Sequence, residues 1–442
     1  MRTGSPPLTL SAVLSPQTWP FNLKWLPHPT FLVGGSVRDA LLERQSAHLD
    51  LDFVMPEGSV ETARAIARHY KAGFVLLDTE RQIARVVFDH ATADFAQQVG
   101  PTLEMDLQRR DFTVNAIAYN PHTDQLIDPL QGYADLQQGR LRMIALDNLE
   151  EDPLRLLRAY RQAAQLNFSL EAGTQAAIRQ LAPLLGRVAA ERVQAELSYL
   201  FSTPKGTPWI TAAWKDGLLN SWFPSATASS LSLLAAIERA AVILAETCPG
   251  FEGELSRWIR DKSSDRQPGP KAKLTGGSRR TWLSTAKLIS LVSSTPPMAE
   301  TELAPLKYSR AEIQAVTTIL KFLPQIKQVV AQPDGDSCAI RRQQYHLFQG
   351  VGVGFPALAV VAVADGVPVA GIMPLIHRFL TPHDPVAHTP SLLTGQDLMT
   401  TLHLSAGPKI GQLLAEIQLA QAEGRISSRS EALELVTQLF FV

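Results

Sequence analysis

Residues 31–54, FLVGGSVRDALLERQSAHLDLDFV, constrain what this chain can fold into more than any other stretch. The apolar residues 31–33 predict a short buried strand. The glycines Gly34 and Gly35 then predict a turn into a helix, with Ser36 as its N-cap. A helix that starts after glycines binds anions, because its free N–H groups and its dipole point at the ligand and glycine lets the backbone approach closely. The first half of the stretch therefore predicts a phosphate site.

The second half of the stretch carries two aspartates on a predicted strand. Apolar residues alternate with Asp50 and Asp52, so both carboxylates lie on one face. They repel each other unless cations lie between them, and Mg²⁺ bound by carboxylates and substrate phosphates is usual in phosphoryl-transfer sites. An Asp-x-Asp pair on an exposed strand is the alternative. The glycine turn and Arg38, which can add a charge-assisted phosphate contact, favour the magnesium site.

The composition is that of a globular protein without a strong net charge. The chain has 442 residues, of which 45% are hydrophobic and 19% charged, and a net charge of −1. It can bury a large core, and a nucleic-acid partner must meet a local basic surface. Only Cys248 and Cys338 are present, which indicates neither a disulfide framework nor a zinc site and fits a reducing cytoplasm. The segment up to about Pro29 makes a poor signal peptide, and Gly366 and prolines interrupt the apolar run 355–376, so we expect no membrane span.

Two motifs carry a resemblance to a known family. The segment VGGSVRD, followed by DLD, resembles the first motif of the class II tRNA nucleotidyltransferase and bacterial poly(A) polymerase family, within the polymerase-beta-like nucleotidyltransferases. The stretch RRDFTVNA resembles the second, in which an arginine and an aspartate contact the ribose and phosphates of the incoming nucleotide. The resemblance assigns these contacts to Arg110 and Asp111, with Asn115 in support. By spacing alone, Val114 and Ile117 predict a helix packed on the sheet.

A fourth motif of the family resembles the stretch EEDPLRLLRAYRQAAQL. The stretch predicts a helix with Asp152 as N-cap and Pro153 at its first position. In the family an aspartate and the arginine three residues on read the Watson–Crick edge of the base, which implies these roles for Asp152 and Arg155. The chemistry suits them, because Asp accepts from an amino group and Arg donates to ring or carbonyl acceptors. Arg158 and Arg161 follow on the same side as secondary nucleotide contacts, with a solvated basic face as the alternative.

Two more stretches resemble motifs that connect and brace. Residues 128–136 resemble the third motif, a hinge-like connection out of the catalytic sheet, and also read as a plain glycine turn. Residues 186–200 resemble the fifth motif, which braces a helix turn in the family. We therefore expect no chemistry from Arg187, Glu191 or Arg192.

The segment between the first and second motifs predicts the rest of the sheet. Periodicity indicates a helix over 59–70 and strands over 74–77, 83–88 and 93–96. Asp94 lies on the last strand, where the family has a third acidic residue that supports the metal site. A solvated aspartate at a strand edge is the alternative.

The remainder of the chain predicts helices, among them 310–323 and 340–349. Residues 257–280 are basic and broken by Pro, Gly and Ser, so they predict a surface linker that can touch RNA phosphates. The C-terminal part resembles the family's tail. There Lys409, beside a predicted helix N-terminus, is implied to meet the tRNA backbone, with simple packing as the alternative.

The predicted fold is α+β, with a polymerase-beta-like nucleotidyltransferase domain around a small mixed sheet, followed by an all-helical neck, body and tail. We expect a catalytic head at 28–139, a neck with the base-selecting helix at 140–203, a body at 204–330 and a tRNA-binding tail at 331–442. The expected nucleotide-binding residues are Gly34, Gly35, Ser36, Arg38, Arg110, Asp111, Asn115, Asp152, Arg155, Arg158 and Arg161.

The resemblance implies nucleotidyl transfer to the tRNA 3′ end without a nucleic-acid template, with Asp50 and Asp52 holding two Mg²⁺ ions. In full CCA-adding members a long flexible loop precedes the RRDFT motif, whereas residues 94–107 leave little chain for one. That departure resembles members that add only two cytidines, so we expect CC addition from CTP. The alternatives are complete CCA addition with CTP and ATP, a poly(A) polymerase, and a non-catalytic tRNA-binding protein. We expect a cytoplasmic enzyme and no protein partner.

Overall fold

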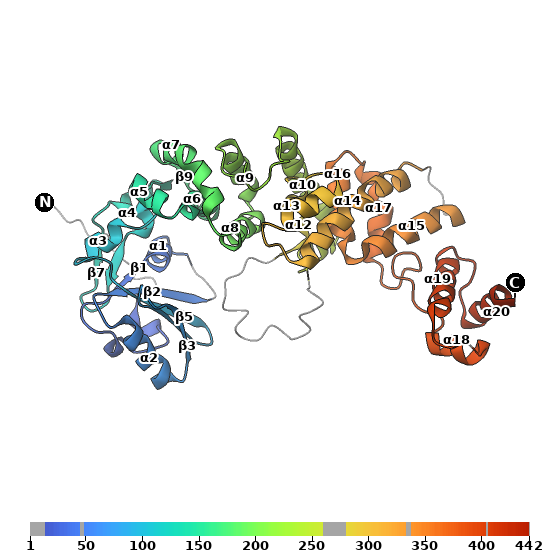
Figure 1. Cartoon of the computed structure of the whole chain (residues 1–442), viewed down its shortest axis with the longest axis horizontal. Coiled ribbons are helices and arrows are strands. Elements are labelled where there is room, and N and C mark those ends of the chain that lie inside the picture. The colour runs from blue at the N-terminus through green and yellow to red at the C-terminus, as the bar shows by residue number, and fades with distance from the viewer. Residues whose placement is uncertain (1–13, 45–47, 260–279, 333–336, 404, 442) are drawn as a thin grey trace. The chain divides into compact units, whose positions relative to one another are not determined.

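The computed structural model describes residues 14–44, 48–259, 280–332, 337–403 and 405–441 (Figure 1). Its described residues divide between Ser221 and Trp222 into an N-terminal unit and a C-terminal unit. The finer division into head, neck, body and tail stays a prediction.

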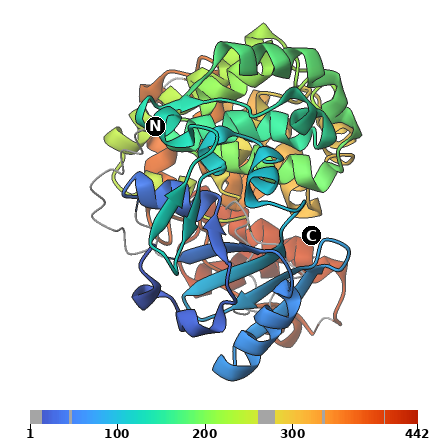
Figure 2. The same ribbon diagram turned by 90° about the vertical axis from the view of Figure 1, so that its left-hand side faces the viewer.

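A seven-stranded mixed sheet forms the core of the first half of the N-terminal unit, with the strand order β3-β4-β5-β2-β1-β6-β7. Figure 2 shows the strands, from blue to cyan, side by side. The predicted mixed sheet is thereby confirmed: β2 and β5 pair in parallel, and the other described neighbours pair antiparallel. The strands are β1 (Phe31–Val33), β2 (Leu49–Met55), β3 (Gly73–Asp78), β4 (Ile83–Val87), β5 (Ala91–Gln97), β6 (Ala118–Asn120) and β7 (Gln125–Ile127).

The alternation along β2 sorts its side chains as the sequence predicts. Leu51 and Phe53 are each 1% exposed, and the Phe53 ring stacks on Phe95 of β5 at 5.3 Å between centroids. The two aspartates of β2 lie on the opposite face. Helix α2 (Ser59–Tyr70) has the predicted bounds and packs on β4 and β5.

The start of the first helix differs from the prediction. Helix α1 (Gly35–Leu41) takes Gly34 as its N-cap, and the Ser36 hydroxyl donates instead to the carbonyl of Val33 at 3.0 Å. The reason is the φ of 75° at Gly34, which glycine adopts without strain and which turns the chain two residues earlier than a Ser36 cap.

The helix predicted from Val114 and Ile117 is wrong. A short 3₁₀ turn, η3 (Thr113–Asn115), leads directly into β6. Thr, Val and Asn are weak helix formers, and β6 pairs with β1 and so satisfies backbone groups of both strands. Val114 and Ile117 are still buried, and η3 packs against α1 and α4.

A buried carboxylate ties down the stretch that resembles a hinge. Asp135 is fully buried and accepts hydrogen bonds from Thr113, Arg140 and Arg142, each between 2.7 and 2.8 Å. A Cβ at Gly132 would lie 2.2 Å from the carbonyl oxygen of Thr113, so the helix that begins there needs glycine. This connection is therefore packed firmly against η3.

Short elements and helices complete the N-terminal unit. They are α3 (Leu103–Gln108), α4 (Gly132–Gln137), β8 (Arg140–Leu141), α5 (Leu146–Glu151), α6 (Leu154–Leu166), β9 (Ser169–Leu170), α7 (Ala172–Leu181), η4 (Ala182–Arg187), α8 (Ala190–Ser202) and α9 (Gly206–Lys215). Helix α6 packs against both α8 and α9, which brings its arginines next to side chains of α8.

The C-terminal unit is helical, as predicted, in the residues that the structure describes. Its elements are α10 (Ala228–Thr247), α11 (Phe251–Leu255), α12 (Trp282–Ile289), α13 (Pro296–Leu303), α14 (Arg310–Val330), α15 (Cys338–Val351), η6 (Gly352–Gly354), α16 (Phe355–Ala364), α17 (Val369–Leu380), α18 (Gly395–Leu402), α19 (Pro408–Ala422) and α20 (Arg429–Phe441). Two helical stretches are long and apolar enough to cross a membrane, namely 228–247 and 338–364. Helix α16, within the second, has its first eight residues buried against α10, α12 and α14, which is also how a core helix packs.

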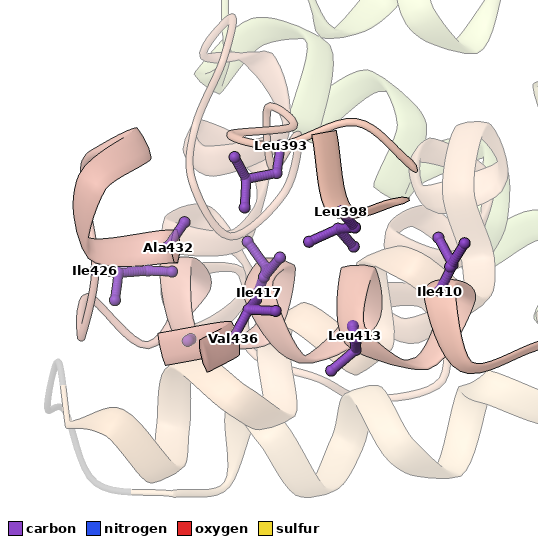
Figure 3. Packing of buried hydrophobic residues seen from close by; sticks show 9 residues of the cluster. Leu393, Leu398, Ile410, Leu413, Ile417, Ile426, Ala432 and Val436 are labelled. Atoms are coloured by element: carbon purple, nitrogen blue, oxygen red, sulfur yellow. The ribbon is translucent and has the colours of Figure 1, made fainter. Parts of the chain in front are cut away.

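The last three helices form a core of their own. Leucine and isoleucine side chains of α18 and α19 meet Ala432 and Val436 of α20 (Figure 3). The buried cluster consists of Leu393, Leu398, Ile410, Leu413, Ile417, Ala420, Ile426, Ala432 and Val436.

Candidate active site

The glycine turn between β1 and α1 opens onto two charged side chains. A Cβ at Gly34 would lie 3.4 Å from both Asp52 Oδ2 and Arg110 Nη1, so the missing side chain leaves room beside them. Arg38, on α1, donates from Nη1 to Asn115 Oδ1 at 2.7 Å. The turn thus presents backbone and two arginines to one place, as a phosphate site requires.

The two aspartates of β2 have different surroundings. Asp52 is partly buried and lies in register with Asp94 of β5. Burial and the Asp94 charge raise the pKa of Asp52 to about 6, although Arg110 acts in the opposite direction. Asp50 is exposed, accepts from Thr92 Oγ1 at 2.5 Å and has no place in the cavity described below.

This concentration of negative charge fits a divalent cation. An ion near Asp50 and Asp52 would offset the repulsion that raises the pKa of Asp52. In the described part of the chain no group of three or more His, Cys, Asp and Glu side chains is arranged to hold a metal. Carboxylates that bind a divalent cation commonly share it with oxygens of a bound phosphate.

Asp94 is not an edge residue. Strand β5 lies between β4 and β2, so the alternative of a solvated aspartate at a strand edge is wrong. Arg85 of β4 holds both carboxylate oxygens of Asp94, at 2.6 and 2.7 Å. The negative charge of Asp94 therefore acts on Asp52, and the positive charge of Arg85 partly offsets it. Its expected support of a metal site stays a prediction.

A cavity of about 480 Å³ brings most of the predicted residues together. The cavity lies within the N-terminal unit. Two lining residues, Gln162 and Arg192, were missing from all predicted site residues, whereas the predicted site residues Ser36 and Asp50 do not line the cavity. The lining consists of Gly34, Gly35, Arg38, Asp52, Arg110, Asp111, Asn115, Asp152, Arg155, Arg158, Arg161, Gln162 and Arg192.

Asp111 organises one wall of this cavity. Its Oδ2 accepts from Arg158 Nη2 at 3.0 Å, and its Oδ1 accepts from Asn115 Nδ2 at 2.8 Å. Burial would raise the pKa of Asp111, but Arg158 and the hydrogen bonds from Asn115 and the Phe112 amide lower it to about 2. Asp111 is therefore ionised at neutral pH. Its predicted ribose contact stays a prediction.

The expected cap of α6 is displaced by one residue. Pro153, not Asp152, is the N-cap, and Leu154 begins the helix. Asp152 has an extended backbone with φ −131° and closes α5, while the fixed φ of Pro153 suits the residue that leads into a helix. Within its own stretch of chain, the Asp152 carboxylate accepts one long hydrogen bond, from the Leu154 amide at 3.4 Å. The carboxylate is therefore available to a side chain from another helix.

That side chain is Arg192, for which the sequence predicted no chemistry. Arg192 of α8 donates to both oxygens of Asp152, at 2.9 and 3.1 Å. Burial would raise the pKa of Asp152, and Arg192 lowers it below its usual range. Arg155 donates instead to the Asn148 carbonyl at 2.7 Å. Asp152 and Arg192 are 40 positions apart, so no local sequence signal points to this pair, and the packing of α8 on α6 brings them together.

The remaining arginines of α6 do not form a solvated basic face, so that alternative is wrong. Arg161 is 16% exposed and donates to Glu196 of α8, and Arg158 lies 3.6 Å from the same carboxylate. One buried glutamate thus fixes two arginines at the cavity wall.

Lys409 lies in the other unit, exposed in the first turn of α19. Its role toward tRNA stays a prediction. Most of the basic stretch 257–280 falls outside the described residues, so its predicted linker role is not addressed by the structure.

Family models match three successive parts of the chain. Residues 30–142 match the poly A polymerase head domain. Residues 167–229 match a model described as "Probable RNA and SrmB- binding site of polymerase A". Residues 278–436 match tRNA nucleotidyltransferase domain 2.

Whole-length relatives agree with these matches. The CC-adding tRNA nucleotidyltransferase of Synechocystis sp. is 46% identical over 425 residues, which cover 96% of each chain. The A-adding tRNA nucleotidyltransferase of Deinococcus radiodurans is 31% identical over 92% of this chain and 94% of its own. The Thermotoga maritima CCA-adding enzyme complexed with tRNA shares the fold, with a TM-score of 0.67 at 21% identity over 93% of this chain and 91% of its own. With this fold, this cavity and a relative 46% identical over nearly its whole length, the chain belongs to the tRNA nucleotidyltransferase and poly(A) polymerase family.

Proposed function

We propose that this chain is a CC-adding tRNA nucleotidyltransferase that transfers two cytidylates from CTP to the 3′ end of tRNA in the cytoplasm. The family's enzymes use divalent metal ions, and Mg²⁺ held by Asp50 and Asp52 is the proposed ion here. When bound, such ions lower the pKa of an attacking hydroxyl and neutralise a triphosphate.

The triphosphate half of the cavity follows from its donors. Gly34 and Gly35 leave space for phosphate oxygens, and Arg38 and Arg110 supply positive charge beside them. In-line displacement at a phosphate depends on positioning and charge stabilisation. These residues are proposed to hold the triphosphate in line with the hydroxyl of the RNA.

The base half of the cavity carries Asp152, Arg155 and Arg192. A carboxylate accepts from the amino group of cytosine, and a guanidinium donates to its ring nitrogen and carbonyl oxygen. Uracil lacks that amino group and presents a carbonyl oxygen in its place, so UTP would set an acceptor against the Asp152 carboxylate and bind less well than CTP. Choice of the base by side chains makes a nucleic-acid template unnecessary.

The short connection between β5 and α3 is the structural feature that favours CC addition over complete CCA addition in this proposal. Only residues 98–102 join the two elements. The Gln98 amide donates to the Met55 carbonyl at 2.7 Å, the Val99 amide donates to Asp106, and Thr102 caps α3. A connection tied at three points resembles the members that lack the long loop. The 46% identical relative, itself named as CC-adding, supports the same proposal.

The test is to incubate the purified protein with Mg²⁺, CTP and ATP and either of two tRNAs, one ending at the discriminator base and one ending in two cytidines. We expect the first to gain two cytidines and the second to stay unchanged. Adenosine added to both would show complete CCA addition. Adenosine added to the second alone would show A addition, which the Deinococcus radiodurans relative makes a specific rival. The variant Asp50→Ala is the inactive control.

A third substrate separates the more distant rivals. An unstructured RNA of similar length should not be extended with ATP, and extension would indicate a poly(A) polymerase. If neither tRNA were extended by the wild type while both bound, the non-catalytic alternative would be correct.

A further inference from the structure

The C-terminal unit contains a second cavity, of about 800 Å³, which the nucleotidyl-transfer site leaves unexplained. It lies within this unit, where residues 257–259, the first residue of α12, the first half of α14 and residues 349–354 at the end of α15 line it; these three helices are labelled in Figure 1. Its lining includes two arginines, two tryptophans and two glutamines, and none of the lining residues is acidic.

The rim of the cavity exposes an aromatic ring at a fixed place. Trp258 is 55% exposed, a large value for its side chain. Its backbone pairs with Thr281 in an antiparallel bridge, in which the Ile259 amide donates to the Arg280 carbonyl at 3.0 Å. An exposed indole held by the backbone offers a flat surface for stacking.

Another part of the lining is the glycine-rich segment 350–354. A Cβ at Gly350 would lie 2.0 Å from the Phe322 ring, and one at Gly354 would lie 3.3 Å from the ring of buried Trp282. Gly352 has φ 55° and open space where a Cβ would be. Two glycines therefore let the wall pack closely, and the third leaves its backbone accessible from the cavity side.

The charged residues of the cavity are arginines. Arg310 is exposed in the first turn of α14, and Arg257 is 65% exposed, with one contact to Glu254 at 2.7 Å. The carboxylate of the nearby Glu312 is 5% exposed and pairs with Arg280. The lining residues therefore carry positive charge and no carboxylate, although Glu254 pairs with Arg257 beside the cavity.

We propose that this cavity binds one unpaired nucleotide of the RNA substrate, with its base against Trp258 and its phosphates facing Arg257 and Arg310. The inference rests on the proposed function, because it takes tRNA as the RNA substrate. Aromatic stacking accepts any base, and an arginine can bind a phosphate. The amides of Gln314 and Gln349 can donate to and accept from a base edge. With a net charge of −1 on the whole chain, RNA has to be held by local basic surfaces, and the arginines of this cavity can form one of them.

The test measures tRNA binding by the full-length protein without CTP. Its result can therefore be interpreted even if the protein adds no nucleotides. Trp258→Ala should raise the Kd by about tenfold, whereas Trp258→Phe, which keeps a stacking ring, should change it by less than about twofold. Arg310→Ala should lower the slope of log Kd against log salt by about 0.7. The control Arg239→Ala removes an exposed arginine of α10 outside the cavity and should change neither quantity.

A purely structural role predicts different results. Thermal unfolding of each variant identifies any loss of folding, and if Trp258→Ala unfolds, Arg310→Ala and Gln349→Ala decide the question. At saturating tRNA, kcat should be unchanged while KM for tRNA rises. Wild-type Kd in folded Trp258→Ala and Arg310→Ala would overturn the proposal. Displacement of tRNA from this site by free CTP or ATP would also overturn it, in favour of a mononucleotide site.

Discussion

Replacing Asp52 by Asn should abolish nucleotide incorporation and, in the absence of metal, stabilise the protein. Asp52 is partly buried on β2, in register with Asp94 and one residue from Leu51 in the core. Burial and the charge of Asp94 oppose its ionisation and raise the pKa of Asp52 to about 6. Asn has nearly the same shape and no charge, so it removes this cost together with the metal ligand.

The size of the effect follows from the pKa. Asp titrates near 3.8 in the unfolded chain, so between 3.8 and about 6 the native state binds more protons than the unfolded state. The metal-free protein therefore loses stability as the pH rises through this range, and the loss is complete above it. A shift of two pKa units corresponds to about 3 kcal/mol. Because water reaches the partly buried carboxylate, we expect Asp52→Asn to raise the free energy of unfolding by about 1–2 kcal/mol at neutral pH.

Urea unfolding in EDTA measures this difference directly. The midpoint for Asp52→Asn should exceed that of the wild type at neutral pH, and the gap should close in acid. Added Mg²⁺ should then stabilise the wild type and not the variant. Asp89→Asn, at an exposed position in the turn between β4 and β5, is the control and should leave the midpoint unchanged. An equal or lower midpoint for Asp52→Asn at neutral pH would refute the reasoning.

Further substitutions test the base-reading wall and the packed connection. Arg155→Ala should loosen the choice among CTP, ATP, UTP and GTP more than it weakens their binding, because its proposed partner is the base edge; unchanged discrimination on one tRNA would exclude that role. Arg192→Ala should loosen the same choice by freeing the Asp152 carboxylate, and Arg192→Lys should restore it only in part, since Lys lacks the planar pair of donors. Full selectivity in Arg192→Ala would make this ion pair irrelevant to base choice. Asp135→Ala should lower the free energy of unfolding by about 3 kcal/mol, because the fully buried carboxylate holds two arginines and a hydroxyl. Gly132→Ala should cost about 1–3 kcal/mol, since its Cβ would meet a backbone carbonyl at 2.2 Å. Urea unfolding measures both, and wild-type midpoints would contradict the packing argument.

The sequence was most informative where neighbouring residues carry the signal. Alternation in residues 49–55 was enough to place both aspartates on one face of β2, and the periodicity of 59–70 predicted α2 with its observed bounds. Where two local preferences compete, the prediction was less accurate. At Gly34 the chain uses the positive φ that glycine permits, and the Ser36 hydroxyl does not cap the helix. Near Val114 a short 3₁₀ turn precedes the paired strand β6, although the spacing predicted a helix.

Contacts between distant residues were decided by the tertiary structure alone. Asp152 and Arg192 are 40 positions apart, and Arg161 and Glu196 are 35 apart. No spacing rule relates such pairs, because their separation depends on how α6 packs against α8. The sequence by itself determined which local elements carry the candidate residues, since strands and helices follow from residue type and local period, whereas the phosphate, metal and base roles of those residues stay predictions. The packing of helices on helices and of β5 beside β2 determined which of those charges meet, because electrostatic partners are set by distance in space and not by distance along the chain.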